Sequence, residues 1–288
     1  MTDAMKRLLF IAMAALALCF AACEKNQGGS DVTAVKSIKF SNLIYDEPHF
    51  VQEYAPTYTN GLLTKVVAKA WNSTTWTEDG KPAGLIQNSE MVYNIKWDEK
   101  THKISGTVDI KWYDEEKQTL VPAEKNQTVS GTFNDNHDIL SYTDGMVNRA
   151  YEYDGNRQIT KYTVMDNTYN YNWEGGLIVR HDVWSTTHAE IEYGNETNDA
   201  PANANIVMGL FLSGDELPIL GLCGVGVKKI PVKYNEVSTG EYGNTTYYMV
   251  DTKRDASGRI SYITRYMVDG TTGEAFEGGH VERWEIIY

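Results

Sequence analysis

The side chains that could do chemistry in this chain of 288 residues include 39 carboxylates, 6 histidines and 3 cysteines. Their spacing matches neither the serine elbow Gly-x-Ser-x-Gly, nor the zinc motif His-Glu-x-x-His, nor a phosphate-binding loop. Hydrolysis of a glycosidic bond would need two carboxylates about 5 to 10 Å apart. With so many acids present, the sequence neither locates nor excludes such a pair, so a glycan-active hydrolase stays as an alternative function.

Three further groups of reactive side chains have simpler structural explanations. Residues 134–138 (NDNHD) alternate oxygen ligands as a calcium loop does, but they lack its glycine and bidentate glutamate, and a hairpin turn explains them. His181 and His188 are seven residues apart, so within one strand they would face opposite sides and could not share a zinc ion. Cys223 lies in an apolar run, which favours a buried and inert thiol. We therefore expect no enzyme activity, no metal and no cofactor.

Two of the 7 tryptophans stand out by their polar surroundings. Trp76 lies within NSTTWTEDG, and Trp184 precedes Ser-Thr-Thr-His. An exposed indole on a rigid sheet offers an apolar face on which a sugar ring can stack. Trp76 and Trp184 are therefore our candidate ligand-binding aromatics, for a glycan or a peptide.

The composition limits the class of protein. Hydrophobic residues make up 42% and charged residues 23% of the chain, as in an ordinary globular protein. The 26 basic and 39 acidic side chains give a net charge of −13. Because a nucleic-acid-binding protein needs a basic surface, this charge excludes nucleic acid as a partner.

The first 22 residues have the composition of a secretory signal peptide. Lys6 and Arg7 precede the apolar run 8–18, which is shorter than the about 20 residues that a membrane-spanning helix needs. The run leads to Phe20-Ala21-Ala22-Cys23, which resembles the lipobox of bacterial lipoproteins, with Phe20 where leucine is usual. In that class of signal the cysteine becomes the first mature residue and is acylated. Ordinary cleavage that leaves Cys23 unmodified is the alternative.

This resemblance implies a division of the chain into three parts. Residues 1–22 are the lipoprotein signal, and residues 23–35 are the acylated Cys23 followed by a polar, glycine-containing tether. Residues 36–288 form one folded domain. The lipoprotein would be held in the outer membrane by its acyl chains, on either the periplasmic or the cell-surface face.

From residue 37 onward, apolar and polar residues alternate with a period of two, as in half-buried antiparallel strands. The clearest runs are residues 91–97, 104–112, 260–268 and 284–288. Roughly a dozen such runs are bounded by Asn-Gly, Asp-Gly or Gly-Gly turns. We predict an all-β fold, in which a single curved antiparallel meander sheet approaches a β-barrel.

A repeat of twenty residues lies within this pattern. The repeat consists of Phe133-Asn134, Tyr153-Asp154 and Trp173-Glu174. A few residues after each pair comes an aliphatic residue, which is Ile139, Ile159 and Leu177 or Ile178. Residues 254–260 keep the turn but lose the aromatic. The pattern predicts a strand that ends on an aromatic, a turn of Asx and glycine residues, and a returning strand. Residues 151–160 also resemble the YD repeats of RHS-type proteins.

Residues 198–231 break the alternation. A polar start (NDAPANAN) gives way to an apolar run whose spacing favours a short helical insert at about residues 204–223. Asp215 and Glu216 interrupt this run, so it does not predict a transmembrane helix. We expect the insert to cover the apolar face of the sheet. A mobile gate at residues 206–223 would instead make the protein a carrier of apolar ligands.

The order of these motifs resembles a family of uncharacterised lipoproteins of Bacteroidetes-type bacteria, a domain of unknown function with a porin-like fold. The motifs are the lipobox, the hairpin repeats, Glu192-Tyr193-Gly194-Asn195, Lys228-Lys229-Ile230-Pro231 and the turn at residues 255–260. The resemblance covers about residues 36–288. It implies a curved antiparallel meander approaching a barrel, and it supplies no catalytic residues.

A barrel that spans the membrane fits the sequence less well. The ending Trp284-x-Ile286-x-Tyr288 does resemble the last strand of outer-membrane barrels. However, the strand at residues 62–71 places Lys65 and Lys69 among apolar residues, and a lipid anchor would be redundant on such a barrel. We therefore predict a cell-envelope lipoprotein that acts as a non-enzymatic structural or binding module. Its expected partners are the membrane, through the anchor, and a glycan, peptide or lipid ligand.

Overall fold

The computed structural model describes residues 35–60, 62–145, 147–184, 186–197, 224–239 and 244–288. Strands account for 71% of the structure, and the described residues contain no α-helix. Accordingly, none of them belongs to a helix long and apolar enough to cross a bilayer.

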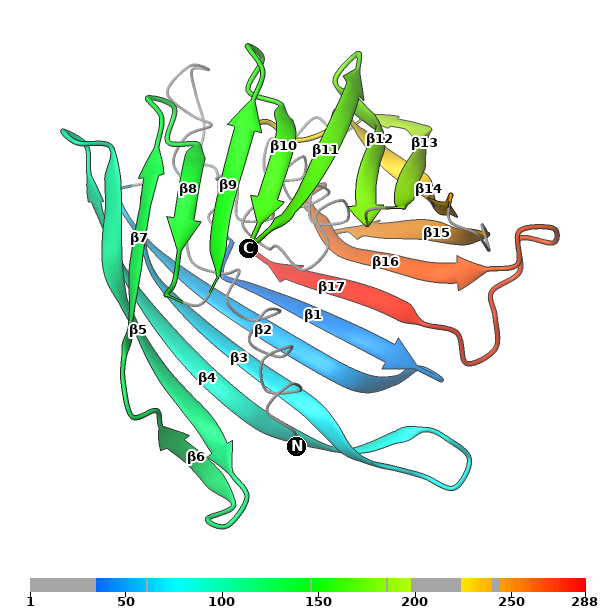
Figure 1. The fold of residues 1–288 in the computed structure, drawn as a ribbon. Coiled ribbons are helices and arrows are strands. Elements are labelled where there is room, and N and C mark those ends of the chain that lie inside the picture. Colours follow the sequence, from blue (N-terminus) through cyan, green and yellow to red (C-terminus); the bar gives the residue numbers. More distant parts are fainter. Residues whose placement is uncertain (1–34, 61, 146, 185, 198–223, 240–243) are drawn as a thin grey trace.

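In the part of the chain that the structure describes, seventeen strands follow one another (Figure 1). They are β1 (Ser37–Ile44), β2 (Glu47–Thr59), β3 (Leu62–Trp76), β4 (Pro82–Asp98), β5 (Lys103–Asp114), β6 (Thr119–Pro122), β7 (Gln127–Phe133), β8 (Ile139–Thr143), β9 (Asn148–Tyr153), β10 (Ile159–Val164), β11 (Asn167–Glu174), β12 (Leu177–Trp184), β13 (Thr187–Thr197), β14 (Lys229–Ser238), β15 (Thr245–Arg254), β16 (Ile260–Val268) and β17 (Val281–Ile287).

The sheet closes on itself because β1 pairs antiparallel with both β2 and β17. Ile38, for example, lies opposite Tyr54 on β2 and opposite Ile286 on β17. The short β6 pairs with the last residues of β5, while β7 pairs with the first part of the same strand. The two therefore share one place in the ring, and the result is a closed antiparallel barrel of 16 strands.

Two neighbouring rows of side chains across β2 to β5 show which face of the sheet points inward. The first row is buried and consists of Tyr54, Ala68, Met91 and Ile110. The second row is one residue away on each strand and consists of Glu53, Lys69, Glu90 and Lys111. Adjacent residues of a strand point to opposite faces, and the interior is the only side on which a closed sheet buries a whole row. The apolar row therefore lines the interior, and the row of alternating charge, here called the charge row, lies on the outer face.

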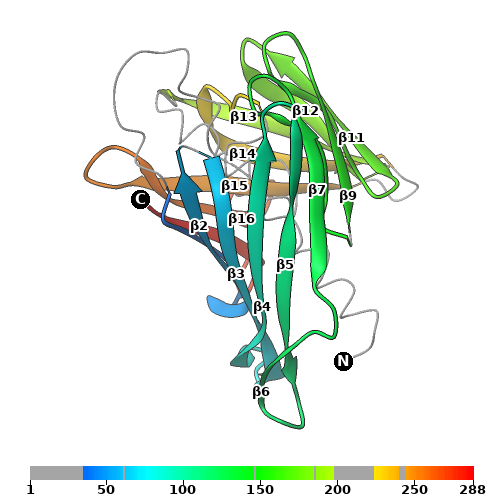
Figure 2. The same cartoon turned by 90° about the vertical axis from the view of Figure 1, so that its left-hand side faces the viewer.

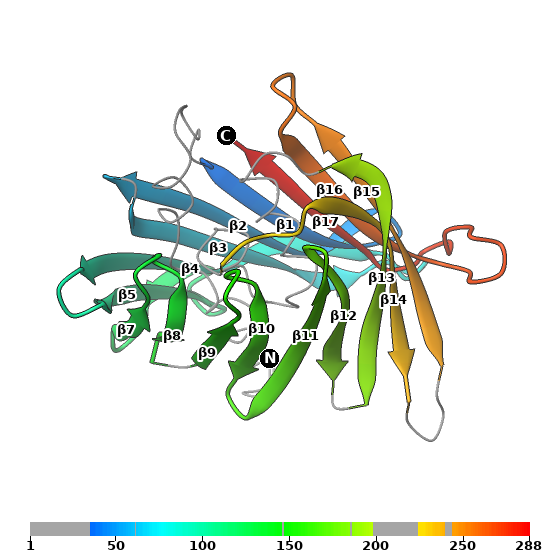
Figure 3. The ribbon, with the colours of Figure 1, turned by 90° about the horizontal axis from the view of Figure 1, so that it is seen from above.

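The two open ends of the barrel are named here by what they carry. The terminal rim holds the start of β1, the end of β17 and the turns that follow β2, β4, β7, β9, β11 and β15. The distal rim holds the turns that follow β1, β3, β5, β8, β10, β12, β14 and β16. Figure 2 shows the long strands β4 and β5 extending to β6 at the distal rim. Figure 3, seen from above, shows β7 to β12 on one side of the barrel and β1, β2, β16 and β17 on the other.

The all-β fold and the antiparallel meander are confirmed, and the sheet goes beyond an approach to a barrel by closing. The four clearest alternating runs fall in β4, β5, β16 and β17. The helical insert expected at about residues 204–223, and with it the gate at 206–223, lies outside the described residues.

Candidate functional site

Three turns of the terminal rim, at residues 134–138, 154–158 and 255–259, share one geometry. In each turn the first side chain accepts two backbone N–H groups; Asp154 Oδ1, for example, accepts from Asn156 at 2.8 Å and from Gln158 at 2.9 Å. Asn134 and Asp255 make the matching bonds in the other two turns. The fourth residue of each turn has a left-handed φ of 60 to 80°. The prediction that residues 134–138 form a hairpin turn is therefore confirmed.

The aromatic that precedes these turns forms a second repeated contact, which we call the aromatic clamp. A side-chain N–H or O–H near the terminal end of one strand donates to the carbonyl oxygen of a residue at the start of the neighbouring strand, at 2.7 to 2.9 Å. The clamps are Trp97 to Leu63, Tyr153 to Ile139, Trp173 to Ile159, Tyr193 to Ile178 and Tyr288 to Ile260. Each clamp ties two adjacent strands together where the ladder of backbone bonds ends.

Burial keeps two of the clamping hydroxyls in their donor form. Desolvation raises the pKa of Tyr193 and of Tyr288 well above the ordinary value for tyrosine. Both therefore stay protonated across the range in which the protein would work, and their clamps do not depend on pH.

The segment Gly224–Lys228, here called the return segment, runs across the terminal rim before β14 begins. The Gly224 N–H donates to the buried carboxylate of Asp138 at 3.2 Å, and the Val225 N–H donates to the Arg157 carbonyl at 2.9 Å. Lys228 N–H donates to the Gly176 carbonyl at 3.2 Å. The segment is thus fastened to the turns after β7, β9 and β11.

Asp138 and Arg157 join two of these turns beneath the return segment. The Arg157 guanidinium donates from Nε at 2.9 Å and from Nη2 at 2.6 Å to the two oxygens of the fully buried Asp138 carboxylate. This bidentate pair satisfies both oxygens and holds the turns at a fixed spacing. Asp138 is the fifth residue of the NDNHD segment. Its carboxylate accepts hydrogen bonds from Arg157 and from the Gly224 N–H.

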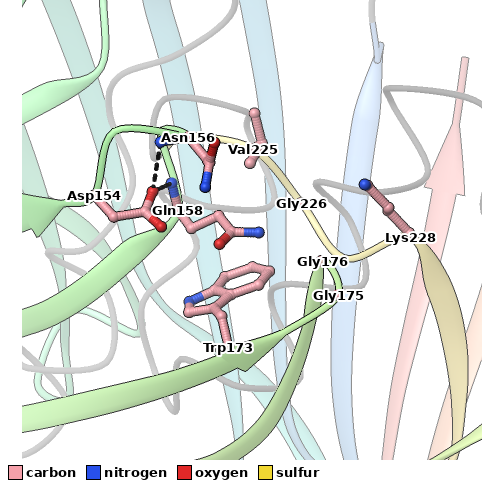
Figure 4. A pocket seen from close by; sticks show the side chains of 9 residues that line it. All are labelled: Asp154, Asn156, Gln158, Trp173, Gly175, Gly176, Val225, Gly226 and Lys228. Atoms are coloured by element: carbon pink, nitrogen blue, oxygen red, sulfur yellow. Dashed lines mark hydrogen bonds between the residues drawn. The ribbon is translucent and has the colours of Figure 1, made fainter.

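A cavity of about 600 Å³ opens between the return segment and the turns after β9 and β11 (Figure 4). It is lined by Asp154, Asn156, Gln158, Trp173, Gly175, Gly176, Val225, Gly226 and Lys228. We call it the rim pocket. Its volume lies within the about 300 to 1,000 Å³ typical of small-molecule sites.

A second group of polar side chains lies on the inner face of the barrel. Arg265 on β16 forms an ion pair with Glu282 on β17, with Nη2 and Nε at 2.6 and 2.8 Å from Oε2. The guanidinium also lies 4.7 Å from the ring centre of Tyr234 and 5.3 Å from that of Tyr248. The charge is therefore enclosed by a carboxylate and two aromatic rings.

His181 on β12 continues this inner group. Burial lowers the pKa of His181 to about 4, so the imidazole is neutral at pH 7. Its Nδ1 lies 2.8 Å from the Asp182 carbonyl, which can only accept, so we assign the proton to Nδ1. Nε2 then accepts from the Tyr234 hydroxyl at 3.1 Å.

His181 and His188, which a shared strand would place on opposite faces, lie in different strands. His181 lies in β12 and His188 in β13, because the chain turns between them. Their side chains nevertheless face opposite sides, since His181 is in register with Ala189 and His188 with Asp182. The described residues hold no cluster of three His, Cys, Asp or Glu side chains that could bind a metal ion. Cys223 lies outside them.

The two candidate tryptophans both end strands at the distal rim. Trp76 is the last residue of β3; its side chain is 51% exposed and lies 5.2 Å from the His49 ring. Trp184 is the last residue of β12, and its side chain lies outside the described part of the structure, as does Cys23. The rim pocket is at the opposite end of the barrel from both tryptophans.

A comparison with solved structures gives a match to the whole fold. The chain is similar to a porin-like protein from Bacteroides uniformis. The alignment has a TM-score of 0.55 and 14% sequence identity, and it covers 89% of this chain and 99% of that one. No protein-family model and no curated protein matches the chain. The porin-like part of the expected resemblance is therefore confirmed for the fold, while the lipoprotein family stays a prediction.

The sequence motifs predicted neither the rim pocket nor the inner ion pair. Asn156 and Gln158 were visible as members of a repeat turn, but the return segment that makes the pocket lies about 70 residues further along the chain. The inner pair left half a signal. Glu282 is in phase with the inward Trp284 and Ile286 of β17, and a charge in such a position indicates a buried partner. Arg265 left none, because the apolar residues at 260, 262, 266 and 268 put it on the polar face, and a register shift near Ile260 turns it inward.

Proposed function

We propose that this chain is a cell-envelope lipoprotein whose barrel stands in water as a non-enzymatic binding module, held at the outer membrane by acyl chains on Cys23. The observation that carries the proposal is the charge row on the outer face. Glu53, Lys69, Glu90 and Lys111 cross four strands, and Lys111 Nζ lies 2.7 Å from Glu90 Oε1.

Further ion pairs continue on the outer face around the barrel. They join neighbouring strands at 2.8 and 2.9 Å: Lys161 to Glu152 and Lys233 to Glu192. A lysine or arginine on the lipid-facing side of a barrel costs about 2 to 4 kcal/mol near the membrane midplane. A membrane-spanning barrel would face lipid with apolar side chains, whereas this barrel turns such side chains inward. A porin-like fold is therefore compatible with a barrel in water.

A non-enzymatic role is supported by the contacts of two acids. The Asp138 carboxylate is held by Arg157, and the Glu282 carboxylate is held by Arg265. In each case a guanidinium donates to the carboxylate and fixes it in place. Acids held in this way serve the packing of the barrel, whereas a general acid needs an open face toward its substrate.

The distal rim supports binding through exposed aromatics. The Tyr45, Trp76 and Phe276 side chains are 43%, 51% and 48% exposed, and they come from the turn after β1, the end of β3 and the turn after β16. Exposed apolar groups gathered at one end of a molecule are typical of interaction surfaces. We propose Trp76 and Trp184 as contacts for a glycan or peptide, tested by Trp76→Ala and Trp184→Ala on glycan and peptide arrays. Unchanged binding by both variants would remove the two tryptophans from the site.

The anchor has a direct test. Growth with labelled palmitate should label the parent protein and leave a Cys23→Ser variant unlabelled. Mass spectrometry of the mature N-terminus should show an acylated cysteine as the first residue. A mature chain that carries a free Cys23 thiol would contradict the proposed anchor.

The second candidate function is a carrier of apolar ligands. It is favoured by the apolar inner row of Tyr54, Ala68, Met91 and Ile110. Native mass spectrometry of the protein after release from its anchor separates the two functions. A carrier co-purifies with lipid, whereas the binding module that we favour gives the mass of the chain alone.

A further inference from the structure

We propose that the rim pocket binds a pyranose ring of a neutral glycan, with the indole of Trp173 as the stacking face and the amides of Asn156 and Gln158 as hydroxyl partners. The inference deepens the proposed binding function and rests on it. It assigns a site at the terminal rim, at the other end of the barrel from Trp76.

The Trp173 indole is fixed before any ligand arrives. Its Nε1 donates to the Ile159 carbonyl at 2.7 Å, and its ring borders the pocket between the turns after β9 and β11 (Figure 4). A ring locked in this way loses little conformational entropy when a ligand packs on it. The apolar face of a sugar ring, which presents C–H groups, is a natural partner for such a platform.

The polar side chains around Trp173 match hydroxyl groups. Asn156 and Gln158 close the turn with backbone groups alone: their N–H groups lie 2.8 and 2.9 Å from Asp154 Oδ1, and the Gln158 carbonyl accepts from the Asp154 N–H at 3.0 Å. Within the described part of the chain, their side-chain amides hydrogen-bond to no other residue. An amide both donates and accepts, as a sugar hydroxyl does, so two of them beside an aromatic ring can bind adjacent hydroxyls.

Backbone groups extend this polar surface. Gly175 and Gly226 have no side chains to cover their peptide groups, so a ligand can approach the chain closely at these two places, whereas the Lys228 side chain covers Gly176. Gly175 and Gly176 also have φ values of 59 and 86°, which favour glycine. The wall thus offers peptide groups in addition to the two side-chain amides.

The balance of charge in the pocket favours a neutral ligand. Lys228 contributes one ammonium group and Asp154 one carboxylate. A phosphate-rich ligand would need an excess of basic groups, and the chain as a whole carries a net charge of −13. An acyl chain would need a mainly apolar wall, whereas Trp173 and Val225 are the two large apolar side chains among the lining residues.

The test uses the full-length lipoprotein in a detergent without a sugar head group. An array of neutral gluco-, manno-, galacto-, xylo- and N-acetylglucosamine oligosaccharides is probed first, and the strongest binder is then titrated by calorimetry. We expect saturable binding that the double variant Asn156→Ala/Gln158→Ala weakens at least tenfold. Because both residues close the turn through their backbones, the circular dichroism spectrum and the melting temperature should stay those of the parent.

Two control variants place the ligand. Asn136 occupies in the turn at residues 134–138 the position that Asn156 occupies in the pocket turn, so Asn136→Ala should leave the affinity unchanged. Gln118→Ala, in the exposed turn after β5 at the distal rim, should also leave it unchanged. A fall in affinity with Trp76→Ala alone would overturn the pocket assignment and leave the proposed binding function standing.

Three further results would overturn the inference. They are the absence of binding to every glycan on the array, binding that the double variant leaves unchanged, and an equal loss with Asn136→Ala. Preference for a nucleoside, tested as adenosine in the same titration, would also count against a pyranose. None of these results bears on the charge row or on the anchor at Cys23, so the proposed envelope location fails or stands by its own tests.

Discussion

The Tyr and Trp residues of this protein serve as hydrogen-bond donors as well as hydrophobic surface. In five places an indole N–H or phenol O–H at the terminal rim donates to a backbone carbonyl of the neighbouring strand. Phe133 holds the same place in the repeat without a donor. It packs instead against Trp97 and His137, with ring centres 4.9 and 5.3 Å away. Five of the 19 tyrosines and 7 tryptophans therefore have a structural role that phenylalanine could not fill.

Tyr153→Phe isolates the contribution of one clamp. The variant removes only the hydroxyl and leaves the partly buried Ile139 carbonyl without its side-chain donor. We expect the free energy of unfolding in urea to fall by about 1 to 2 kcal/mol. Tyr113→Phe is the matched control, because that hydroxyl bonds to Gln118 in the exposed turn after β5 and its loss should change little. Equal effects of the two variants would show that the clamp does not contribute.

The buried, neutral His181 should make the free energy of unfolding depend on pH. Its pKa is about 4 in the folded state and about 6.5 when exposed, so above pH 6.5 it is neutral in both states and has no effect. As the pH falls from 6.5 to 4, the unfolded chain takes up the proton first, and the folded state loses up to roughly 3 kcal/mol of stability.

The prediction is checked by comparing urea unfolding at pH 7 and pH 4.5 in the parent and in His181→Gln. The variant cannot gain this proton, so its stability should fall less between the two pH values than that of the parent. Tyr234 and Arg265 both lie close to the imidazole and keep their charge state over this range. The same loss of stability in both proteins would contradict a buried neutral His181.

At the scale of elements, the return segment matters most because it converts two ordinary hairpin turns into a pocket. Gly224 is its critical position. It has a φ of 71°, and a Cβ there would collide with the Arg157 carbonyl oxygen. The close approach allows the Val225 N–H to reach that same carbonyl.

Gly224→Ala should loosen the return segment without unfolding the barrel. We expect faster hydrogen exchange at Val225 and Lys228, and weaker binding of any ligand of the rim pocket. Gly155→Ala is the control, because Gly155 lies in the adjoining turn with no atom within 4 Å of an added Cβ. Protection of Val225 and Lys228 that is unchanged in Gly224→Ala would show that the segment is held by other contacts.

The repeat predicted the hairpins well, because each turn is a local structure. Phe133 and Tyr153 end β7 and β9, as their spacing indicated, and Trp173 is the penultimate residue of β11. Irregularities inside a strand left no such signal. A bulge between Leu63 and Lys65 turns Leu63 inward and Lys65 outward, although simple alternation puts both on one face.

At the scale of the molecule, the barrel combines a closed ring with an apolar interior and a charged exterior. Alternation along the sequence predicted that one face would be apolar. It could not predict closure, because the pairing of β1 with β17 joins residues about 250 positions apart. The direction of the apolar face depends on that closure, and so do the inner ion pair and the rim pocket.

The most direct test of a barrel that stands in water uses residues 24–288, which lack the signal and the acylated cysteine. The charge row predicts that this protein is folded, β-rich by circular dichroism and monodisperse in buffer without detergent. Light scattering should give the same protein mass when micelles are added, with no bound detergent. Aggregation that only detergent relieves, together with a bound micelle belt, would contradict the account.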